Sequence, residues 1–194
     1  MSQKTEISGH THLISLLGSP IRHSMSPATH NLSFEKLDVD SIYVVFDVKQ
    51  DDLPDIIAAM KRMDGWDGSN VTMPCKNKVA QCVDELSPAA KIIGAVNTIV
   101  NEDGKLVGHI TDGIGYMQSL KDNDIDVIGK KMTIAGAGGA ATAIEIQAAL
   151  DGVSTLHIFN RKGRSWERAK KLADTINAGT SCVADVSDLA DETA

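Results

Sequence analysis

Residues 132–150 read MTIAGAGGAATAIEIQAAL, and this stretch decides the fold class. A short apolar strand, Met132–Ala135, runs into a glycine-rich turn, and the turn opens a helix that continues to Leu150. In the pattern G-x-G-x-x-G/A, Gly136 permits the tight turn, Gly138 lets the backbone approach a ligand, and the small Ala141 lets helix and strand pack closely. The position of this pattern between a strand and a helix is typical of a dinucleotide-binding sheet, whereas the bare pattern also serves plain turns.

The elements that follow continue the alternation. We predict a strand over Thr155–Asn160, a helix over Trp166–Ile176 and a strand over Ser181–Val186. Together with the first strand and helix they make a βαβαβ unit, which is half of a Rossmann domain. Since such a domain normally has a second half, we expect a chain that ends at Ala194 to be truncated at its C-terminus.

The end of the second predicted strand indicates the cofactor. The glycine turn offers free N–H groups and the positive end of a helix dipole to a pyrophosphate. NAD-binding domains usually carry an acidic residue near the second strand, but here the cations Arg161, Lys162 and Arg164 follow Asn160. An arginine binds a 2′-phosphate through a planar fork of donors, so the sequence favours NADP, with NAD as the alternative. A solvated basic turn is the structural alternative.

The residues before Lys130 also alternate between strands and helices. The expected strands are His12–Leu17, Ile42–Val48 and Gly68–Met73, and the expected helices are 26–37 with Ser26 as N-cap, one that starts at Asp51, Asn77–Leu86 and Gly113–Lys121. A hairpin is expected around 102–104. The pattern predicts an α/β substrate domain with a mostly parallel sheet at 1–111, followed by a partial Rossmann domain at 112–194.

Composition excludes several classes of protein. The net charge of −7 argues against nucleic acid as a partner, and no apolar run is long enough to cross a membrane. The polar start lacks the apolar core of an export signal, so we expect a cytoplasmic location. The three cysteines match neither a disulfide framework nor a zinc site, and no metal is expected. The sequence leaves monomer and homodimer open.

Small polar residues gather where the strands of the first domain are expected to end. The segments are Ser24–Pro27, Asn70–Lys76, Ala95–Thr98 and, at the domain boundary, Thr111–Gly113. Ligands of open α/β sheets bind outside these ends, where hydroxyls and amides suit a polyol and Lys76 with Asp112 suits an acid/base pair. Each residue alone also fits a structural role as a cap, a turn residue or a solvated lysine.

Five motifs resemble those of the shikimate dehydrogenase family, in that family's order and spacing. They are SMSP at 24–27, NVTMPCK at 70–76, GAVNT at 94–98, TDG at 111–113 and GAGGAA at 136–141. The stretch VDELSPAAK at 83–91 is most similar to the quinate/shikimate branch. The resemblance covers about residues 12–190.

The resemblance implies an NAD(P)-dependent oxidoreductase of the aromatic amino acid precursor pathway. It would transfer a hydride between NADP(H) and shikimate/3-dehydroshikimate; the alternatives are a quinate dehydrogenase that uses NAD and a non-catalytic ligand-sensing relative. The implied roles are a substrate carboxylate site at Ser24 and Ser26, ring-hydroxyl contacts at Thr72, Asn97 and Asp112, a catalytic pair of Lys76 and Asp112, a pyrophosphate site at Gly136, Gly138, Gly139 and Ala140, and ribose contacts at Asn160 and Arg161.

The chain departs from the family pattern at two positions. Ile110 stands where the family usually has Asn before TDG, so one polar neighbour of Asp112 is missing. Gly163 stands where the quinate/shikimate branch often has Asp, which weakens the case for NAD. The family pattern also includes a substrate-contacting Gln and a strand that completes the nicotinamide pocket. Neither feature has a counterpart in this sequence before Ala194.

Overall fold

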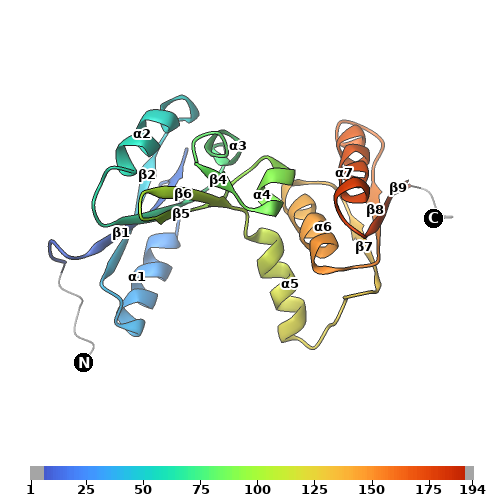
Figure 1. Cartoon of the computed structure of the whole chain (residues 1–194), viewed down its shortest axis with the longest axis horizontal. Coiled ribbons are helices and arrows are strands. Elements are labelled where there is room, and N and C mark those ends of the chain that lie inside the picture. The colour runs from blue at the N-terminus through green and yellow to red at the C-terminus, as the bar shows by residue number, and fades with distance from the viewer. Residues whose placement is uncertain (1–6, 191–194) are drawn as a thin grey trace. The chain divides into compact units, whose positions relative to one another are not determined.

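The computed structural model describes residues 7–190, which form two compact units. The first unit ends at His109 and the second begins at Ile110. Each unit has its own sheet, and the two sheets have six and three strands. Figure 1 shows the order of the elements along the chain.

A mixed sheet forms the centre of the first unit, with the strand order β2-β1-β3-β5-β6-β4. Its strands are β1 (His12–Gly18), β2 (Ser41–Asp47), β3 (Trp66–Val71), β4 (Glu85–Leu86), β5 (Thr98–Glu102) and β6 (Lys105–His109). β1 pairs in parallel with β2 and β3, and β4 pairs in parallel with β6. β5 runs antiparallel to both β3 and β6, so the predicted hairpin is confirmed.

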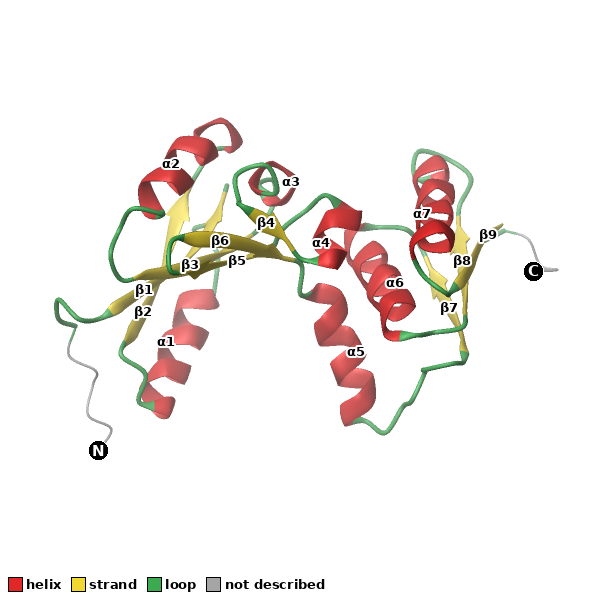
Figure 2. Ribbon diagram, in the orientation of Figure 1, coloured by secondary structure: helices red, strands yellow, loops and turns green. Residues whose placement is uncertain are grey.

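The helices of the first unit are α1 (Ser26–Leu37), the short 3-10 turn η1 (Gln50–Asp52), α2 (Leu53–Met60), α3 (Lys76–Val79) and α4 (Pro88–Ile93). Figure 2 shows α1 and α2 on opposite sides of the sheet. Leu53 and Ile57 of α2 are buried, as are Tyr43 and Trp66 of the strands. Removing these apolar side chains from water is the main contribution to the stability of the folded unit.

Two local predictions for the first unit are wrong. The helix expected over Asn77–Leu86 ends at Val79, because Asp84 is held on β6: its carboxylate accepts hydrogen bonds from Leu106 N at 2.7 Å and from Lys61 Nζ at 2.6 Å. Glu85–Leu86 then joins the sheet as β4. Ser26 is not the N-cap of α1 but its first residue, and Met25 is the N-cap.

The second unit contains the predicted βαβαβ arrangement. Its elements are α5 (Asp112–Asp122), β7 (Lys131–Ala135), α6 (Gly139–Asp151), β8 (Thr155–Asn160), α7 (Trp166–Gly179) and β9 (Val183–Asp188). The three strands are parallel and lie in the order β7-β8-β9, which confirms the predicted α/β class. No helix among residues 7–190 is both long and apolar enough to span a membrane.

α5 packs tightly on α6 at Gly113. A Cβ atom added there would lie 2.2 Å from the carbonyl oxygen of Ala143, which is backbone and cannot move aside. Glycine at this position is therefore required for the two helices to approach each other, and it fixes the start of α5 against α6.

Candidate functional site

Three predicted substrate residues line one cavity in the first unit. The cavity has a volume of about 700 Å³, and Ser24, Ser26 and Thr72 are among the side chains around it. Ser19 and Thr72, which also line it, directly follow β1 and β3, so the cavity lies at the carboxyl ends of two parallel strands. This is the edge at which open α/β sheets bind their ligands.

Hydrogen bonds hold the backbone of the segments that carry the polar groups of this cavity. The backbone N–H of Ser24 donates to Ile21 O at 3.0 Å, and the Ser24 hydroxyl accepts from the N–H of Ser26 at 3.2 Å. Thr72 N donates to Leu17 O at 2.9 Å, which ties the end of β3 to the end of β1. The backbone that carries Ser24, Ser26 and Thr72 is thereby held at one end of the sheet.

A chain of polar side chains leads from the serine segment to Asn97. The Tyr43 hydroxyl donates to Asn70 Oδ1 at 2.9 Å, Asn70 Nδ2 donates to Thr98 Oγ1 at 3.3 Å, and Thr98 Oγ1 donates to Asn97 Oδ1 at 3.1 Å. Burial raises the pKa of Tyr43, and a hydrogen bond with Ser26 opposes the rise. Sequence reasoning missed Tyr43, which looked like an ordinary residue of an apolar strand.

Lys76 and Asn97 lie on neighbouring segments, although neither lines the cavity. Lys76 is the first residue of α3, and its carbonyl oxygen accepts a hydrogen bond from Val96 N at 2.9 Å. Asn97 is 9% exposed, and its backbone bonds both Val71 and His109. The structure therefore brings the NVTMPCK and GAVNT segments side by side.

Asp112 begins α5 and belongs to the second unit. The predicted pair of Lys76 and Asp112 thus joins residues of different units and stays a prediction. Ile110, at the position where the resemblance implies Asn, is 5% exposed and belongs to the apolar core.

The glycine loop is open beside its backbone and leads directly into α6. Gly136 has a φ of 103°, a conformation that favours glycine, and Gly138 is the N-cap of α6. A Cβ atom added at Gly136, Gly138 or Gly139 would meet nothing within 4 Å, so the loop has open space beside its backbone. Gly139 and Ala140 form the first turn of α6, where N–H groups have no acceptor within the helix. Free N–H groups at a helix start are the kind of donors that bind phosphate, so pyrophosphate binding by this loop stays a prediction.

The turn after β8 places the other two predicted cofactor residues differently. Asn160 is 5% exposed, and its Nδ2 donates to Arg161 O at 3.1 Å and to Ser165 Oγ at 3.0 Å, so its side chain shapes the turn. Arg161 is exposed. The neighbouring Lys162 pairs with Asp188 at 3.2 Å. Contact of Asn160 and Arg161 with a ribose stays a prediction.

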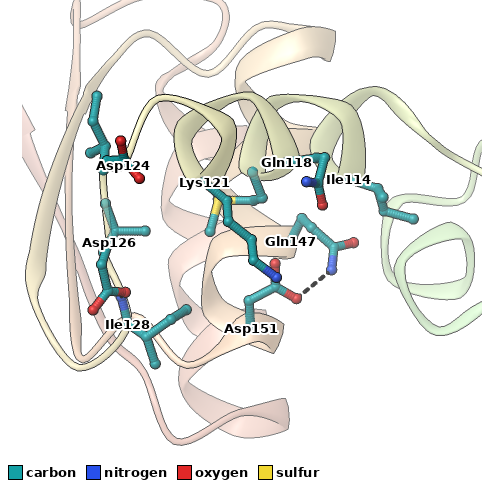
Figure 3. Close-up of a pocket in the computed structure, with 11 residues that line it drawn as sticks. Ile114, Gln118, Lys121, Asp124, Asp126, Ile128, Gln147 and Asp151 are labelled. Carbon is teal, nitrogen blue, oxygen red and sulfur yellow. Dashed lines mark hydrogen bonds between the residues drawn. The ribbon is translucent and has the colours of Figure 1, made fainter.

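A second cavity, of about 780 Å³, lies within the second unit between α5, the segment after it and α6. Figure 3 shows its apolar residues, such as Ile114 and Ile128, beside Lys121 and Asp151. None of the predicted site residues lines it, so we do not assign the site there. Within the described part of the chain, no group of three or more His, Cys, Asp or Glu side chains could hold a metal ion.

Comparison with known proteins gives consistent matches. Residues 16–99 match the model of the shikimate dehydrogenase substrate binding domain. The shikimate dehydrogenase (NADP(+)) of Listeria monocytogenes is 53% identical over 187 residues, which are 95% of this chain and 63% of that protein. This chain therefore spans less than two thirds of the length of that relative.

Several solved structures match over most of the chain, and two of them illustrate the range of identity. The crystal structure of shikimate 5-dehydrogenase from Listeria monocytogenes, in complex with shikimate and NAD, has a TM-score of 0.89 and 53% identity, and the match covers 94% of this chain and 63% of that one. The ligand-free 5-ketofructose reductase of Gluconobacter has a TM-score of 0.85 and 32% identity, with 93% and 64% covered.

Proposed function

Because this chain belongs to the shikimate dehydrogenase family, we propose that the protein transfers a hydride between NADP(H) and shikimate/3-dehydroshikimate. The observation that carries the proposal is the cavity at the ends of β1 and β3, which gathers Ser24, Ser26 and Thr72. Two serine hydroxyls with nearby backbone N–H groups can hold a carboxylate without a fixed cation. The small polar hydroxy-carboxylate that this site suits is also the kind of ligand bound in the Listeria relative.

Each predicted residue has a role in this proposal. Ser24 and Ser26 bind the substrate carboxylate, and Thr72, Asn97 and Asp112 bind ring hydroxyls. Lys76 donates the proton that the ketone oxygen needs when that oxygen becomes a hydroxyl, and Asp112 orients the ammonium group.

The glycine loop would hold the cofactor through its backbone. Gly136, Gly138, Gly139 and Ala140 give the open turn and the free N–H groups for the pyrophosphate. When bound, the nicotinamide supplies the hydride, while the protein supplies position and electrostatics. The exposed Arg161 is the candidate partner of a 2′-phosphate, since Lys162 is engaged with Asp188. We place this activity in the cytoplasm, as expected from the sequence.

Steady-state assays with shikimate and quinate, each with NADP and NAD, test the proposal. We expect the highest catalytic efficiency with shikimate and NADP. Higher efficiency with quinate and NAD would support the branch alternative. Tight shikimate binding without turnover would indicate a ligand-sensing protein.

A further inference from the structure

Arg168 reaches from α7 to the glycine loop. Its Nη2 atom donates a hydrogen bond to the carbonyl oxygen of Ala137. The residue Ala137 as a whole is 2% exposed. The peptide bond between Ala137 and Gly138 is trans, since the cis bonds of the described residues lie at Pro20 and Pro74. A trans peptide is planar and points its C=O and N–H in opposite directions. Holding the Ala137 oxygen therefore also fixes the direction of the Gly138 N–H, a donor of the proposed pyrophosphate site.

Glu145 of α6 is buried, and the charge of Arg168 acts on its carboxyl group. Its exposed fraction is 0%, and neither carboxylate oxygen has a hydrogen-bond partner among the described residues. Burial raises the pKa of Glu145 to about 8, and the charge of Arg168 opposes the rise. Since an unpartnered buried charge is costly, Glu145 is mostly protonated at neutral pH, which leaves the guanidinium to Ala137.

Other charged groups near α6 do not replace Arg168 in this role. α6 is packed against α5, β7, β8 and α7. The titratable or charged side chains on these elements and on α6 itself, besides Arg168 and Glu145, are Asp112, Tyr116, Lys121, Asp122, Lys131, Asp151, His157, Glu167, Lys170, Lys171 and Asp174. His157 pairs with Asp185, and Glu167 pairs with Lys170. Arg168 is the charged group that acts on Glu145.

Building on the proposed NADP(H) function, we propose that Arg168 and Glu145 are positioning residues of the cofactor loop: Arg168 fixes the Ala137–Gly138 peptide, and ionised Glu145 competes with Ala137 for the guanidinium. A carboxylate is a stronger acceptor for arginine than a neutral carbonyl. Loss of the Glu145 proton therefore draws Arg168 away from the loop. The Gly138 N–H then loses its fixed direction, and cofactor binding weakens as pH rises through about 8.

The first test needs no cofactor. The carbonyl ¹³C chemical shift of Ala137 reports the hydrogen bond to its oxygen, and we expect it to titrate between pH 6 and 9.5 in the wild type. Glu145→Gln removes the carboxyl group that can ionise, and Arg168→Met removes the guanidinium that donates to Ala137. The titration should therefore disappear in both variants. Lys171→Met, which removes an exposed cation from the same helix, should keep it. An Ala137 shift that is flat in the wild type, or that still titrates in Glu145→Gln, overturns the inference.

The second test measures the dissociation constant of NADPH by fluorescence. One linked proton with a pKa of about 8 weakens binding by at most about 10-fold between pH 7 and pH 9. We expect this weakening in the wild type, a flat profile in Glu145→Gln, and weak binding at both pH values in Arg168→Met. Arg168→Lys, which keeps the charge but loses the fork, serves if the methionine variant does not fold. Equal pH profiles in the wild type and Glu145→Gln contradict the inference. A wild type that binds no NADPH contradicts the proposed function instead. In that case the Ala137 titration decides the inference.

Discussion

Glu145 should make the second unit less stable as pH rises from acid to neutral. Its ordinary pKa is 4.5, whereas the folded protein raises it to about 8. Between these values the unfolded chain releases the proton and the folded chain keeps it, so the free energy of unfolding falls with increasing pH. Glu145→Gln carries a neutral group of nearly the same shape and should abolish this loss.

The expected size follows from the width of that window. Each pH unit within it costs about 1.36 kcal/mol of stability for a single proton. Between pH 5.5 and pH 7.5 the difference in unfolding free energy between Glu145→Gln and the wild type should therefore grow by about 2–3 kcal/mol in favour of the variant. The full penalty is present only above pH 8, where the folded protein must also ionise the buried group.

Urea unfolding at both pH values measures this difference. Trp166 lies in α7 of the second unit, so its fluorescence in a Trp66→Phe background reports the unit that contains Glu145. Glu167→Gln is the matched control, because Glu167 is on the surface and its side chain is 80% exposed. If the advantage of Glu145→Gln is the same at pH 5.5 and pH 7.5, the carboxyl group does not hold its proton in the folded protein and the reasoning fails.

Three further predictions concern the proposed site and apply to full-length protein. Lys76→Ala should lower kcat by about 10²–10⁴ with an unchanged circular dichroism spectrum, because the ketone oxygen loses its proton donor; near-normal turnover would remove Lys76 from the mechanism. Ser24→Ala should raise the KM for shikimate by about 5- to 150-fold, equivalent to roughly 1–3 kcal/mol, and leave NADPH affinity unchanged; a loss of NADPH affinity instead would mean that the serine site is misplaced. Arg161→Ala should reduce the ratio of kcat/KM with NADP to that with NAD; an NADP preference that survives the substitution would belong to another residue.

Regular patterns in the sequence predicted most of the fold. The glycine loop at 136–141, the hairpin at 102–104 and the βαβαβ order are each encoded by residues close together in the chain, so propensity and spacing suffice to find them. Boundaries were less accurate: β3 and β9 are shifted by two residues from the expected ranges. Strand ends depend on pairing with distant partners, and pairing is a tertiary property.

What the sequence could not predict depends on contacts between distant residues. Asp84 stops the expected helix only because Lys61 and Leu106 lie beside it in the folded chain. Tyr43 joins the polar network only because β2, β1 and β3 are neighbours. The motifs had marked Ser24, Ser26 and Thr72, but no local pattern indicates that they line one cavity.

Glu145 stands out when it is compared with the other buried polar side chains. Ser15 bonds Ser69, Asn97 accepts from Thr98, and Asn160 holds its turn, so each of these groups replaces the water that it gave up. Glu145 has no such partner among residues 7–190, although it lies on the helix that starts at the cofactor loop. Leucine would fill a similar space in α6 without the cost of a buried carboxyl group. Burial raises the pKa of Glu145 to about 8, and the charge of Arg168, the arginine that holds Ala137, opposes the rise. The proposed effect on the loop gives this buried acid a role that packing does not.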